Sequence, residues 1–302
     1  MRFNILTFNN QVGIVTDAIL LCNLIKTHID KNVQIIFLNE TKCNFDAEIG
    51  IWIQNFDINV LNNFKKNIFF INEEWAGNHE LNNLHLFDYV ICKSQYAKNL
   101  LKDYDNVTYI PFISNNIFDI RTQKSNRFLH FMGRSIQKNT ELVLKQSVPI
   151  TLIDPYNRYK PHSNFTHINS YQTNESISNL LNSHNIHICC SLYESWGHYL
   201  FEGLSTGNEI ICSDIPVFKE NLDPNLVHFI STVEKTDDSY LYCSENKNNF
   251  YKFRKSFFVD ENYLKNKIEN FETIGKSEER RKLFNKIHDA GCNQIKNFLI
   301  NM

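Results

Sequence analysis

Short apolar runs of strand length alternate along this chain with longer segments of helical periodicity, and the alternation occurs twice. The first series runs from residues 3–8 to residues 107–112, and the second from residues 128–131 to residues 209–212. Strands that alternate with helices predict a parallel sheet covered by helices on both faces. We therefore expect an α/β protein with two similar units in tandem and a ligand cleft between the carboxyl ends of their strands.

The alternation lapses into polar residues between positions 114 and 126, where we place the boundary between the units. The expected organisation is an N-terminal domain over residues 1–120 and a C-terminal domain over residues 121–276. Residues 277–302 show helical periodicity and are expected to pack back across the domains. Residues 232–256 are polar, so we expect irregular surface structure there.

The composition is that of a globular protein, with 42% hydrophobic, 13% aromatic and 21% charged residues in a chain of 302. A formal net charge of -2 does not indicate a nucleic-acid partner. No apolar run approaches the roughly 18 residues of a membrane span. The eight cysteines form no C-x-x-C pair and most lie in apolar runs, which predicts reduced, buried thiols and a cytoplasmic location.

The motif with the most chemical content is Glu-Ser-Trp-Gly-His-Tyr-Leu-Phe-Glu at residues 194–202. It follows the strand-like run 187–192 and opens the helix-like run 199–205. A strand, a glycine turn and a helix N-terminus form a cradle for an anionic group. With a rise of about 1.5 Å per helical residue, Glu194 and Glu202 would contact opposite ends of a nucleotide-sized ligand.

Several segments, in order, resemble the retaining glycosyltransferases of the two-Rossmann-domain (GT-B) type, in particular the large family four, of which this chain would be a short, divergent member. The matching segments are Asp88 to Ser94, Ile110 to Phe118, Phe131 to Asn139, Glu194-x7-Glu202, and Thr206 to Pro216 with Glu220 beyond. Together they cover most of residues 88–220. The resemblance implies two Rossmann-like parallel-sheet domains facing a cleft, the first on the acceptor side and the second on the nucleotide-sugar donor side.

The resemblance also assigns roles to residues of the second domain. Arg134 and Lys138 would stabilise the negative charge that develops on the departing nucleoside diphosphate, so no metal ion would be needed. Glu194 would bind hydroxyls of the donor sugar, and Glu202 would accept hydrogen bonds from the ribose. The catalytic group is therefore Arg134, Lys138 and Glu194. The donor-binding residues are Gly13, Gly133, Trp196, Gly197, His198, Tyr199 and Glu202.

The implied reaction moves a sugar from a nucleoside-diphosphate-sugar to an acceptor hydroxyl with retention at the anomeric carbon. The nucleotide-sugar is a co-substrate, and no other cofactor is expected. The donor's phosphate oxygen would take the acceptor proton, so no general base is assigned. The acceptor (glycan, lipid or protein) is not specified by the sequence.

Two alternatives share this fold: a catalytically silent nucleotide-sugar-binding module, and a sugar-nucleotide epimerase. Slow hydrolysis of the donor in the absence of acceptor would distinguish the transferase from the silent module. An epimerase would form its product without any acceptor. A nicotinamide oxidoreductase is disfavoured, because Gly13 alone stands where G-x-G-x-x-G would follow the first strand.

Some positions have equally good structural explanations. Gly13 suits a simple tight turn, and Trp196 suits a core aromatic. His198, Tyr199 and Glu209 depart from the usual family residues, a proline being common at position 209. The stretch from Leu152 to Asn157 replaces the glycine-rich turn that the family carries there.

Two further groups of residues are weaker candidates for binding sites. The C-terminal helix carries a basic face that is a candidate for peripheral membrane contact, although a solvated helix face explains it more simply. This face consists of Arg280, Arg281, Lys282 and Lys286. A zinc site at His184, His187, Cys189 and Cys190 is disfavoured, because adjacent cysteines in a strand point to opposite faces.

Overall fold

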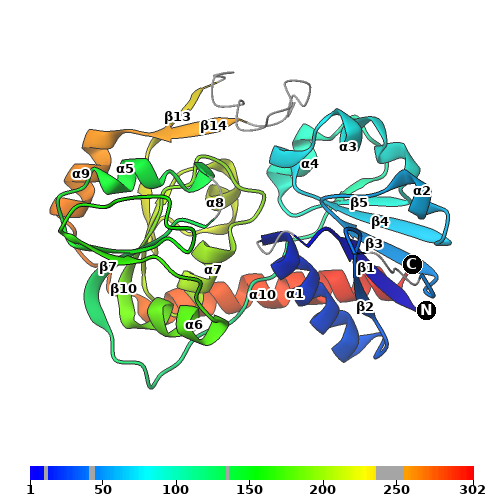
Figure 1. Cartoon of the computed structure of the whole chain (residues 1–302), viewed down its shortest axis with the longest axis horizontal. Helices are drawn as coiled ribbons and strands as arrows, with labels where there is room; N and C mark the ends of the chain where they lie inside the picture. The colour runs from blue at the N-terminus through cyan, green and yellow to red at the C-terminus, as the bar shows by residue number, and fades with distance from the viewer. Residues whose placement is uncertain (10–12, 41–44, 134–135, 236–254) are drawn as a thin grey trace. The chain divides into compact units, whose positions relative to one another are not determined.

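The protein was analysed as a computed structural model, and its described residues form two compact units. The structure describes all residues except 10–12, 41–44, 134–135 and 236–254. Unit 1 contains residues 1–113 and 288–302, and unit 2 contains residues 114–235 and 255–287. Each unit has its own parallel sheet, as the double alternation in the sequence predicts (Figure 1).

The sheet of unit 1 has six parallel strands in the order β2-β1-β3-β4-β5-β6. Its strands are β1 Phe3–Thr7, β2 Gln34–Phe37, β3 Ile49–Ile53, β4 Lys66–Ile71, β5 Tyr89–Cys92 and β6 Val107–Tyr109. The central strands β1 and β3 are buried along their whole length. Helices cover both faces of such a sheet, so its central strands consist of near-continuous apolar residues.

The helices of unit 1 divide between the two faces of this sheet, with α1 on one side and α3 and α4 on the other (Figure 1). They are α1 Gly13–His28, α2 Ile58–Leu61, α3 Asn78–Asn82 and α4 Gln95–Leu100, with 3₁₀ turns η1 Glu73–Trp75 and η2 Leu84–Leu86. Ser94 caps α4 by accepting a hydrogen bond from the Ala97 N–H at 3.0 Å. The cap fixes α4 directly after β5.

The sheet of unit 2 also has six parallel strands, in the order β12-β11-β10-β7-β8-β9. They are β7 Ser125–Phe131, β8 Ile150–Ile153, β9 Phe165–Ile168, β10 His184–Cys189, β11 Glu209–Ser213 and β12 His228–Ile230. The chain proceeds from β7 outward to β9 and then returns to the other side of β7 to form β10. The strand order therefore reverses between β7 and β10, and ligands of open α/β sheets bind at the carboxyl ends beside such a reversal.

The helices of unit 2 also cover both faces of their sheet (Figure 1). They are η3 Ile136–Lys138, α5 Thr140–Leu144, α6 Asn174–Ser183, α7 His198–Ser205, α8 Pro216–Asn221 and α9 Glu261–Glu269. Helices α5 and α9 contribute Leu142, Val143, Leu264 and Ile268 to one core cluster. Helices α6 and α7 pack beside β10.

The predicted irregular stretch 232–256 is wrong in part. Residues Thr232–Lys235 form β13, which pairs in antiparallel fashion with β14 at Ser256–Val259. Three of the four β13 residues are exposed, and so the polar sequence gave no strand signal.

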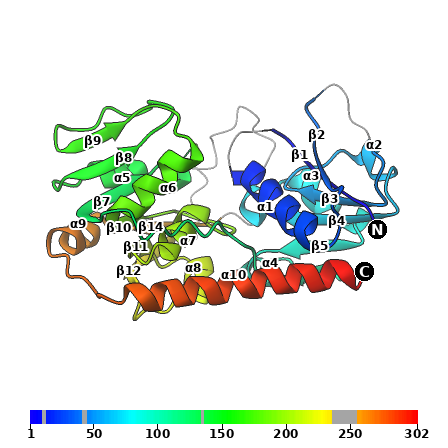
Figure 2. The same ribbon diagram turned by 90° about the horizontal axis from the view of Figure 1, so that it is seen from below.

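The last helix, α10, spans Ser277–Ile300 without a break (Figure 2). Its first part belongs to unit 2, and its part from His288 onward belongs to unit 1. In unit 1, Gly291 lies against the backbone of Phe112, where a Cβ would approach the carbonyl oxygen to 2.7 Å. The Phe298 ring packs edge-on against Tyr89, with a centroid separation of 5.1 Å. A glycine at position 291 thus permits close packing of the helix.

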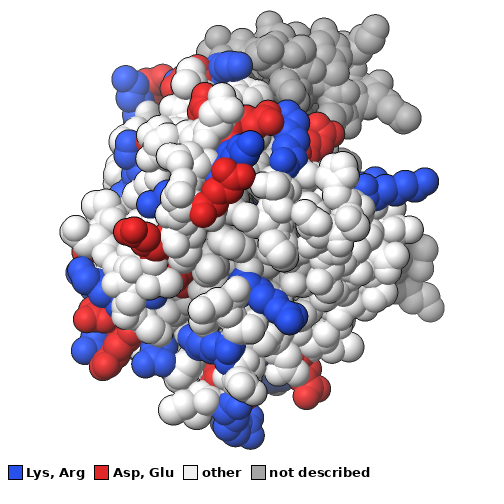
Figure 3. Space-filling view, turned by 90° about the vertical axis from the view of Figure 1, so that its left-hand side faces the viewer, with Lys and Arg blue, Asp and Glu red and all other residues white. Residues whose placement is uncertain are grey.

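Charges on the face of unit 2 seen in Figure 3 are mixed, with acidic and basic side chains interspersed. This distribution agrees with the small net charge of the chain. Within the described residues, no helix combines the length and apolar character needed to cross a membrane. The six cysteines in the described parts of the chain are free thiols, and burial raises the pKa of Cys190 to about 12.

Candidate active site at the carboxyl edge of unit 2

Lys138 and Glu194 form an ion pair at the point where the strand order of unit 2 reverses. Lys138 ends the 3₁₀ turn η3 that follows β7, and Glu194 lies in the loop between β10 and α7. Because β7 and β10 are neighbours, their carboxyl ends bring together two residues that are 56 positions apart in the chain. The structure thus unites two of the three predicted catalytic residues.

The Glu194 carboxylate is buried, with only 8% of the residue exposed, and both of its oxygens are bound. Oε1 accepts hydrogen bonds from Lys138 and from the Ser191 hydroxyl, the latter at 2.8 Å. Oε2 accepts one from the Gln137 amide at 3.0 Å. The Lys138 side chain is 18% exposed, so it is neither an ordinary surface charge nor sealed from solvent. A cation held this way is preorganised for an anionic ligand.

Neither Gln137 nor Ser191 was singled out from the sequence. Gln137 lies beside Lys138 in the segment that resembles the family, and Ser191 precedes Glu194 by three residues. Their amide and hydroxyl groups fix the carboxylate, and so both belong to the site. No pattern in the sequence distinguishes them from the many other polar residues in loops.

A neutral histidine of β7, His130, contacts β10. His130 is 1% exposed, with Nδ1 2.9 Å from the Ile188 carbonyl oxygen and Nε2 2.9 Å from the Thr140 hydroxyl. Burial lowers the pKa of His130 to about 4, against the opposing effect of the Ile188 carbonyl, and the nearby charge of Lys138 lowers it further. His130 is therefore uncharged at neutral pH and serves as a structural link.

Gly197 makes the turn that starts α7. Its φ of 99° lies in the left-handed region, which glycine adopts without strain. A Cβ at this position would also approach the Phe218 ring to 2.8 Å. Position 197 thus requires glycine for two independent reasons, and the backbone amides of this turn are arranged at a helix N-terminus, where anions are stabilised.

The side chains of Trp196 and Tyr199 have packing roles. The Trp196 ring is 3% exposed and stacks on Phe201, with a centroid separation of 4.3 Å. Tyr199 is buried, and its hydroxyl donates to the Leu129 carbonyl at 2.9 Å. The core-aromatic interpretation of Trp196 therefore accounts for its ring, and any contact of these two residues with a donor would come from their backbone.

His198 and Glu202 both contact the segment that enters unit 2. His198 Nδ1 lies 3.0 Å from the Ser114 hydroxyl, and Glu202 Oε1 accepts from the Asn115 amide at 2.9 Å. Burial raises the pKa of Glu202, while the charge of His198 and the hydrogen bond from Asn115 lower it. Glu202 lies on the first turns of α7, as the sequence predicts.

The remaining predicted residues lie in different parts of the chain. Gly133 adopts a φ of 61°, and its carbonyl accepts a hydrogen bond from Arg158 at 2.9 Å. Arg134 lies outside the described residues. Gly13 belongs to unit 1, where it begins α1, and a Cβ there would meet no atom within 4 Å. Gly13 therefore fits a simple turn, and the space around it would also admit a larger residue.

Glu209 departs from the family pattern because it anchors α10 in unit 2. Its Oε1 accepts from Arg280 at 2.7 Å and from the Gly275 N–H at 3.0 Å, and its Oε2 lies 3.2 Å from His228 Nε2. Burial alone would raise the pKa of Glu209, but the hydrogen bonds from His228 and Gly275 and the charge of Arg280 lower it to about 2. The acid is therefore a structural group.

This anchor corrects the prediction of a basic face on α10. Arg280 is only 2% exposed, so it is not available to a membrane surface. Arg281 lies over the Phe118 ring at 4.2 Å, and Lys282 pairs with Glu278 at 3.2 Å. Three of the four predicted basic residues therefore have partners within unit 2, and the sequence could not reveal this because Glu209 and Arg280 are 71 positions apart.

The two histidines of the disfavoured zinc site, His184 and His187, contact groups of the protein. His187 Nε2 lies 3.0 Å from the Leu181 carbonyl oxygen, and its ring stacks on Tyr199. His184 lies 2.9 Å from the Thr151 hydroxyl. Among the described residues, no group of three or more histidine, cysteine, aspartate or glutamate side chains is arranged to hold a metal ion.

Unit 1 has its own polar groups at the carboxyl edge of its sheet. Lys93, directly after β5, pairs with Asp17 of α1 at 2.5 Å and lies 4.5 Å from the centre of the Phe112 ring. Glu73 and Glu74, after β4, are 2% and 5% exposed. The His79 ring stacks on Phe56, with a centroid separation of 4.7 Å. Buried charges are energetically costly, so their concentration at this edge favours a binding role.

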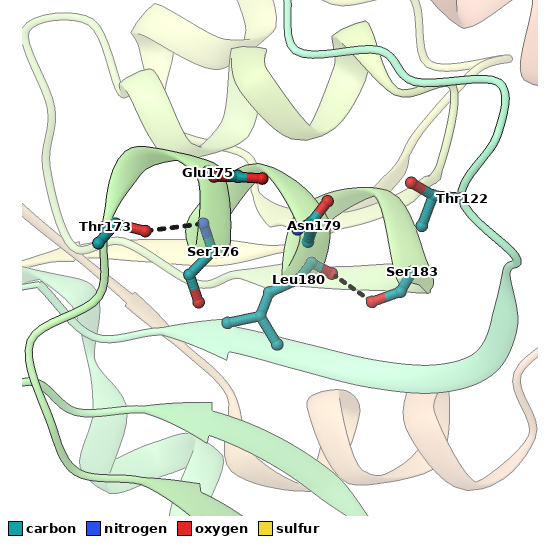
Figure 4. Close-up of a pocket in the computed structure, with 7 residues that line it drawn as sticks. All are labelled: Thr122, Thr173, Glu175, Ser176, Asn179, Leu180 and Ser183. Carbon is teal, nitrogen blue, oxygen red and sulfur yellow. Dashed lines mark hydrogen bonds between the residues drawn. The ribbon is translucent and has the colours of Figure 1, made fainter.

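A pocket elsewhere on unit 2 does not involve the predicted site residues. It has a volume of about 460 Å³ and follows α6 (Figure 4). Its lining residues are Thr122, Thr173, Glu175, Ser176, Asn179, Leu180 and Ser183. The Thr173 hydroxyl accepts from the Ser176 N–H at 3.1 Å, and the Ser183 hydroxyl donates to the Leu180 carbonyl at 3.2 Å. The Thr173 hydroxyl thus caps the N-terminus of α6, and the Ser183 hydroxyl bonds to the last turn of the same helix.

Two parallel six-stranded sheets with these strand orders define the class: the chain has the GT-B fold of glycosyltransferases. No protein-family model matches the chain, and no curated protein matches it by sequence. Solved structures do match. HepE of Anabaena, in a complex with UDP and glucose, aligns with a TM-score of 0.66 at 10% identity over 100% of both chains.

Two further structures show the same likeness. Sucrose-phosphate synthase of Thermosynechococcus elongatus aligns with a TM-score of 0.66 at 11% identity, over 99% of this chain and 98% of the other. A glycosyltransferase of Rickettsia africae aligns with a TM-score of 0.63 at 11% identity, over 98% and 97% of the two chains. The fold is therefore shared over nearly the whole chain, while the sequences have diverged almost completely.

Proposed function

We propose that this protein is a glycosyltransferase that moves a sugar from a nucleoside-diphosphate-sugar to an acceptor hydroxyl with retention of anomeric configuration. The observation that carries the proposal is the half-buried Lys138–Glu194 pair at the strand-order reversal of unit 2. Among the structural neighbours, HepE was solved with UDP-glucose and with UDP. That ligand class has the diphosphate that a fixed lysine and a helix N-terminus would bind.

In this proposal Lys138 contacts the departing diphosphate, and Glu194 holds Lys138 in place. A lysine ammonium has three N–H donors, of which Glu194 takes one. Arg134, two residues from the turn η3, would supply a second cation. Because these cations stabilise the leaving group, the proposed reaction does not depend on a divalent metal ion. Glu194 would in addition contact a hydroxyl of the donor sugar.

The proposed bond changes are simple. The bond between the anomeric carbon and the diphosphate oxygen breaks, and the acceptor oxygen bonds to that carbon on the same face. The acceptor proton passes to the departing phosphate oxygen, so atoms and charge balance without a protein base. We assign acceptor binding to unit 1, where Glu73 and Glu74 are buried at the carboxyl edge of the sheet. A cytoplasmic location follows from the thiol chemistry alone and is part of the proposal.

A thermal-shift screen with UDP, GDP, ADP, CDP and dTDP tests donor binding, since a ligand that binds the folded state adds RT ln(1 + [L]/Kd) to its stability. Hydrolysis of the matching nucleotide-sugar without acceptor then tests catalysis. We expect Glu194→Gln or Lys138→Ala to lower turnover about a hundredfold, the effect of losing one preorganised electrostatic group. Lys160→Ala, an exposed lysine in unit 2, is the matched control and should retain activity.

The outcomes separate the alternatives. Diphosphate binding without any turnover would indicate a silent binding module, and a new nucleotide-sugar formed without acceptor would indicate an epimerase. Turnover within about threefold of wild type in both Glu194→Gln and Lys138→Ala would contradict the assigned site.

A further inference from the structure

The chain enters unit 2 through Ser114 and Asn115, which follow Ile113, the last residue of the first segment of unit 1. The segment is not a loose linker. Ile117 N–H donates to the Ser205 hydroxyl at 3.2 Å, and the Ile117 carbonyl accepts from the buried amide of Asn182 at 2.7 Å. The entry segment is therefore fixed along α6 and α7.

Ser114 holds both sides of the Gly197 turn with one hydroxyl group. Its oxygen accepts a hydrogen bond from Trp196 Nε1 at 2.9 Å and lies 3.0 Å from His198 Nδ1. Ser114 is 1% exposed, so water does not compete for these bonds. Because Trp196 and His198 flank Gly197, a single buried hydroxyl fixes the turn whose amides open α7.

Asn115 orients the second glutamate of the motif. Its amide donates to Glu202 Oε1 at 2.9 Å. Within the part of the chain that the structure describes, Asn115 is the one hydrogen-bond donor to this carboxylate. The amide therefore fixes one oxygen and leaves Oε2 to accept from a ligand hydroxyl. It also favours the charged form of Glu202 against the effect of burial.

We propose that Ser114 and Asn115 are positioning residues of the donor site: Ser114 fixes the turn at Gly197, and Asn115 presents Glu202 to a hydroxyl of the nucleotide ribose. The inference rests on the proposed function, because it takes the ligand of Glu202 to be a nucleoside diphosphate. It adds two residues that lie 82 and 87 positions before their partners, outside the Glu194-x7-Glu202 motif.

Calorimetric titration of the full chain with UDP, GDP and ADP tests the inference. We expect Asn115→Ala to weaken diphosphate binding about tenfold, the effect of losing one hydrogen bond to a charged group. Ser114→Ala should have an effect of the same order. Asn116→Ala is the matched control, because Asn116 is exposed like Asn115 but its side chain contacts the Phe118 N–H at 3.3 Å and Asn285 at 3.5 Å rather than Glu202. Far-ultraviolet circular dichroism verifies that each variant is folded.

A pH profile of Asn115→Asp provides a readout that a purely structural role would not change. The new carboxylate would face Glu202 and repel it at pH 8, whereas at pH 5 the two acids would share a proton and restore a hydrogen bond. The ratio of variant to wild-type Kd should therefore fall as the pH decreases from 8 to 5. If this ratio stays constant, or if Asn115→Ala binds the diphosphate as tightly as Asn116→Ala does, the inference about Ser114 and Asn115 is wrong. Neither result would contradict the proposed function. Absence of binding by the wild-type protein overturns the proposed function as well.

Discussion

Replacing Arg280 with methionine tests how α10 is held in unit 2. The guanidinium is 2% exposed and makes three hydrogen bonds: to the Gly207 carbonyl at 3.1 Å, to the Leu226 carbonyl at 3.1 Å and to Glu209 at 2.7 Å. Methionine fills a similar volume but donates no hydrogen bond. The variant thus leaves two carbonyl groups and one buried carboxylate without their partner.

The expected loss of stability is large. Removing one partner of a buried ion pair costs about 3–5 kcal/mol when the other charge remains buried and uncompensated. Because Glu209 keeps the hydrogen bond from Gly275 and the contact with His228, we expect a loss at the lower end, about 3 kcal/mol. In a unit of this size, about 1 kcal/mol shifts the melting temperature by roughly 2–4 °C. We therefore expect the melting transition of unit 2 to fall by about 6–12 °C. Lys282→Met, two residues away on the exposed face of α10, should leave the transition unchanged.

The Arg280–Glu209 pair also predicts how the stability of unit 2 depends on pH. In the wild-type protein the pKa of Glu209 is about 2 in the folded state and 4.5 is its ordinary value. Its contribution to stability is therefore complete above about pH 4.5 and is lost as the pH falls toward 2. Without Arg280 the folded-state pKa rises, so the variant and the wild type should converge in stability between pH 4.5 and 2.

Urea unfolding followed by circular dichroism, at pH 7 and at pH 3, measures both effects. An Arg280→Met variant with the wild-type midpoint at pH 7 would refute the reasoning, since it would show that the guanidinium is not buried against Glu209. A second variant, Arg280→Met with Glu209→Leu, removes both charges and should recover part of the lost stability, because no unpaired carboxylate remains.

Two other predictions concern unit 2. Burial lowers the pKa of His130 to about 4 and of His187 to about 3, below the ordinary 6.5, so each should reduce stability by up to about 1.4 kcal/mol per pH unit as the pH falls below 6.5. A urea midpoint that is the same at pH 7 and pH 5 would contradict this. Gly197→Ala should destabilise the unit by about 1–3 kcal/mol and reduce diphosphate binding, because of the φ of 99° and the contact with Phe218. Gly13→Ala, with open space at its Cβ, should leave the stability of unit 1 unchanged; equal losses of thermal stability in the two variants would refute the steric argument.

The sequence predicted the parallel sheets because burial on both faces leaves a direct record in the residues. The apolar runs at Ile49–Ile53 and Ile150–Ile153 become β3 and β8, which are buried along their whole length. Elements with mostly polar or short apolar segments were not predicted, as β12, β13, α8 and α9 show. The C-terminal end of β6 was also placed too late, since residues 110–112 are apolar and buried without being paired in the sheet.

The candidate site was only partly accessible from the sequence. Local spacing identified Glu194, Gly197 and Glu202, because a turn between a strand and a helix is a local structure. Gln137 and Ser191 carry no local signal, and they matter only because β7 and β10 are neighbours in the sheet. The packing of the Trp196 ring was left open by the sequence, since its partner Phe201 could equally have faced another element.

By itself, then, the order of apolar and polar residues determined two α/β units and a glycine turn between two glutamates. The tertiary structure alone decided which group each buried or half-buried carboxylate meets: Glu194 meets Lys138, Glu202 meets the Asn115 amide, and Glu209 meets Arg280. The physical reason is that apolar periodicity is set by burial along a single element. The partner of a buried charge is set by the order of strands and the path of distant segments, and this order is not written near either residue.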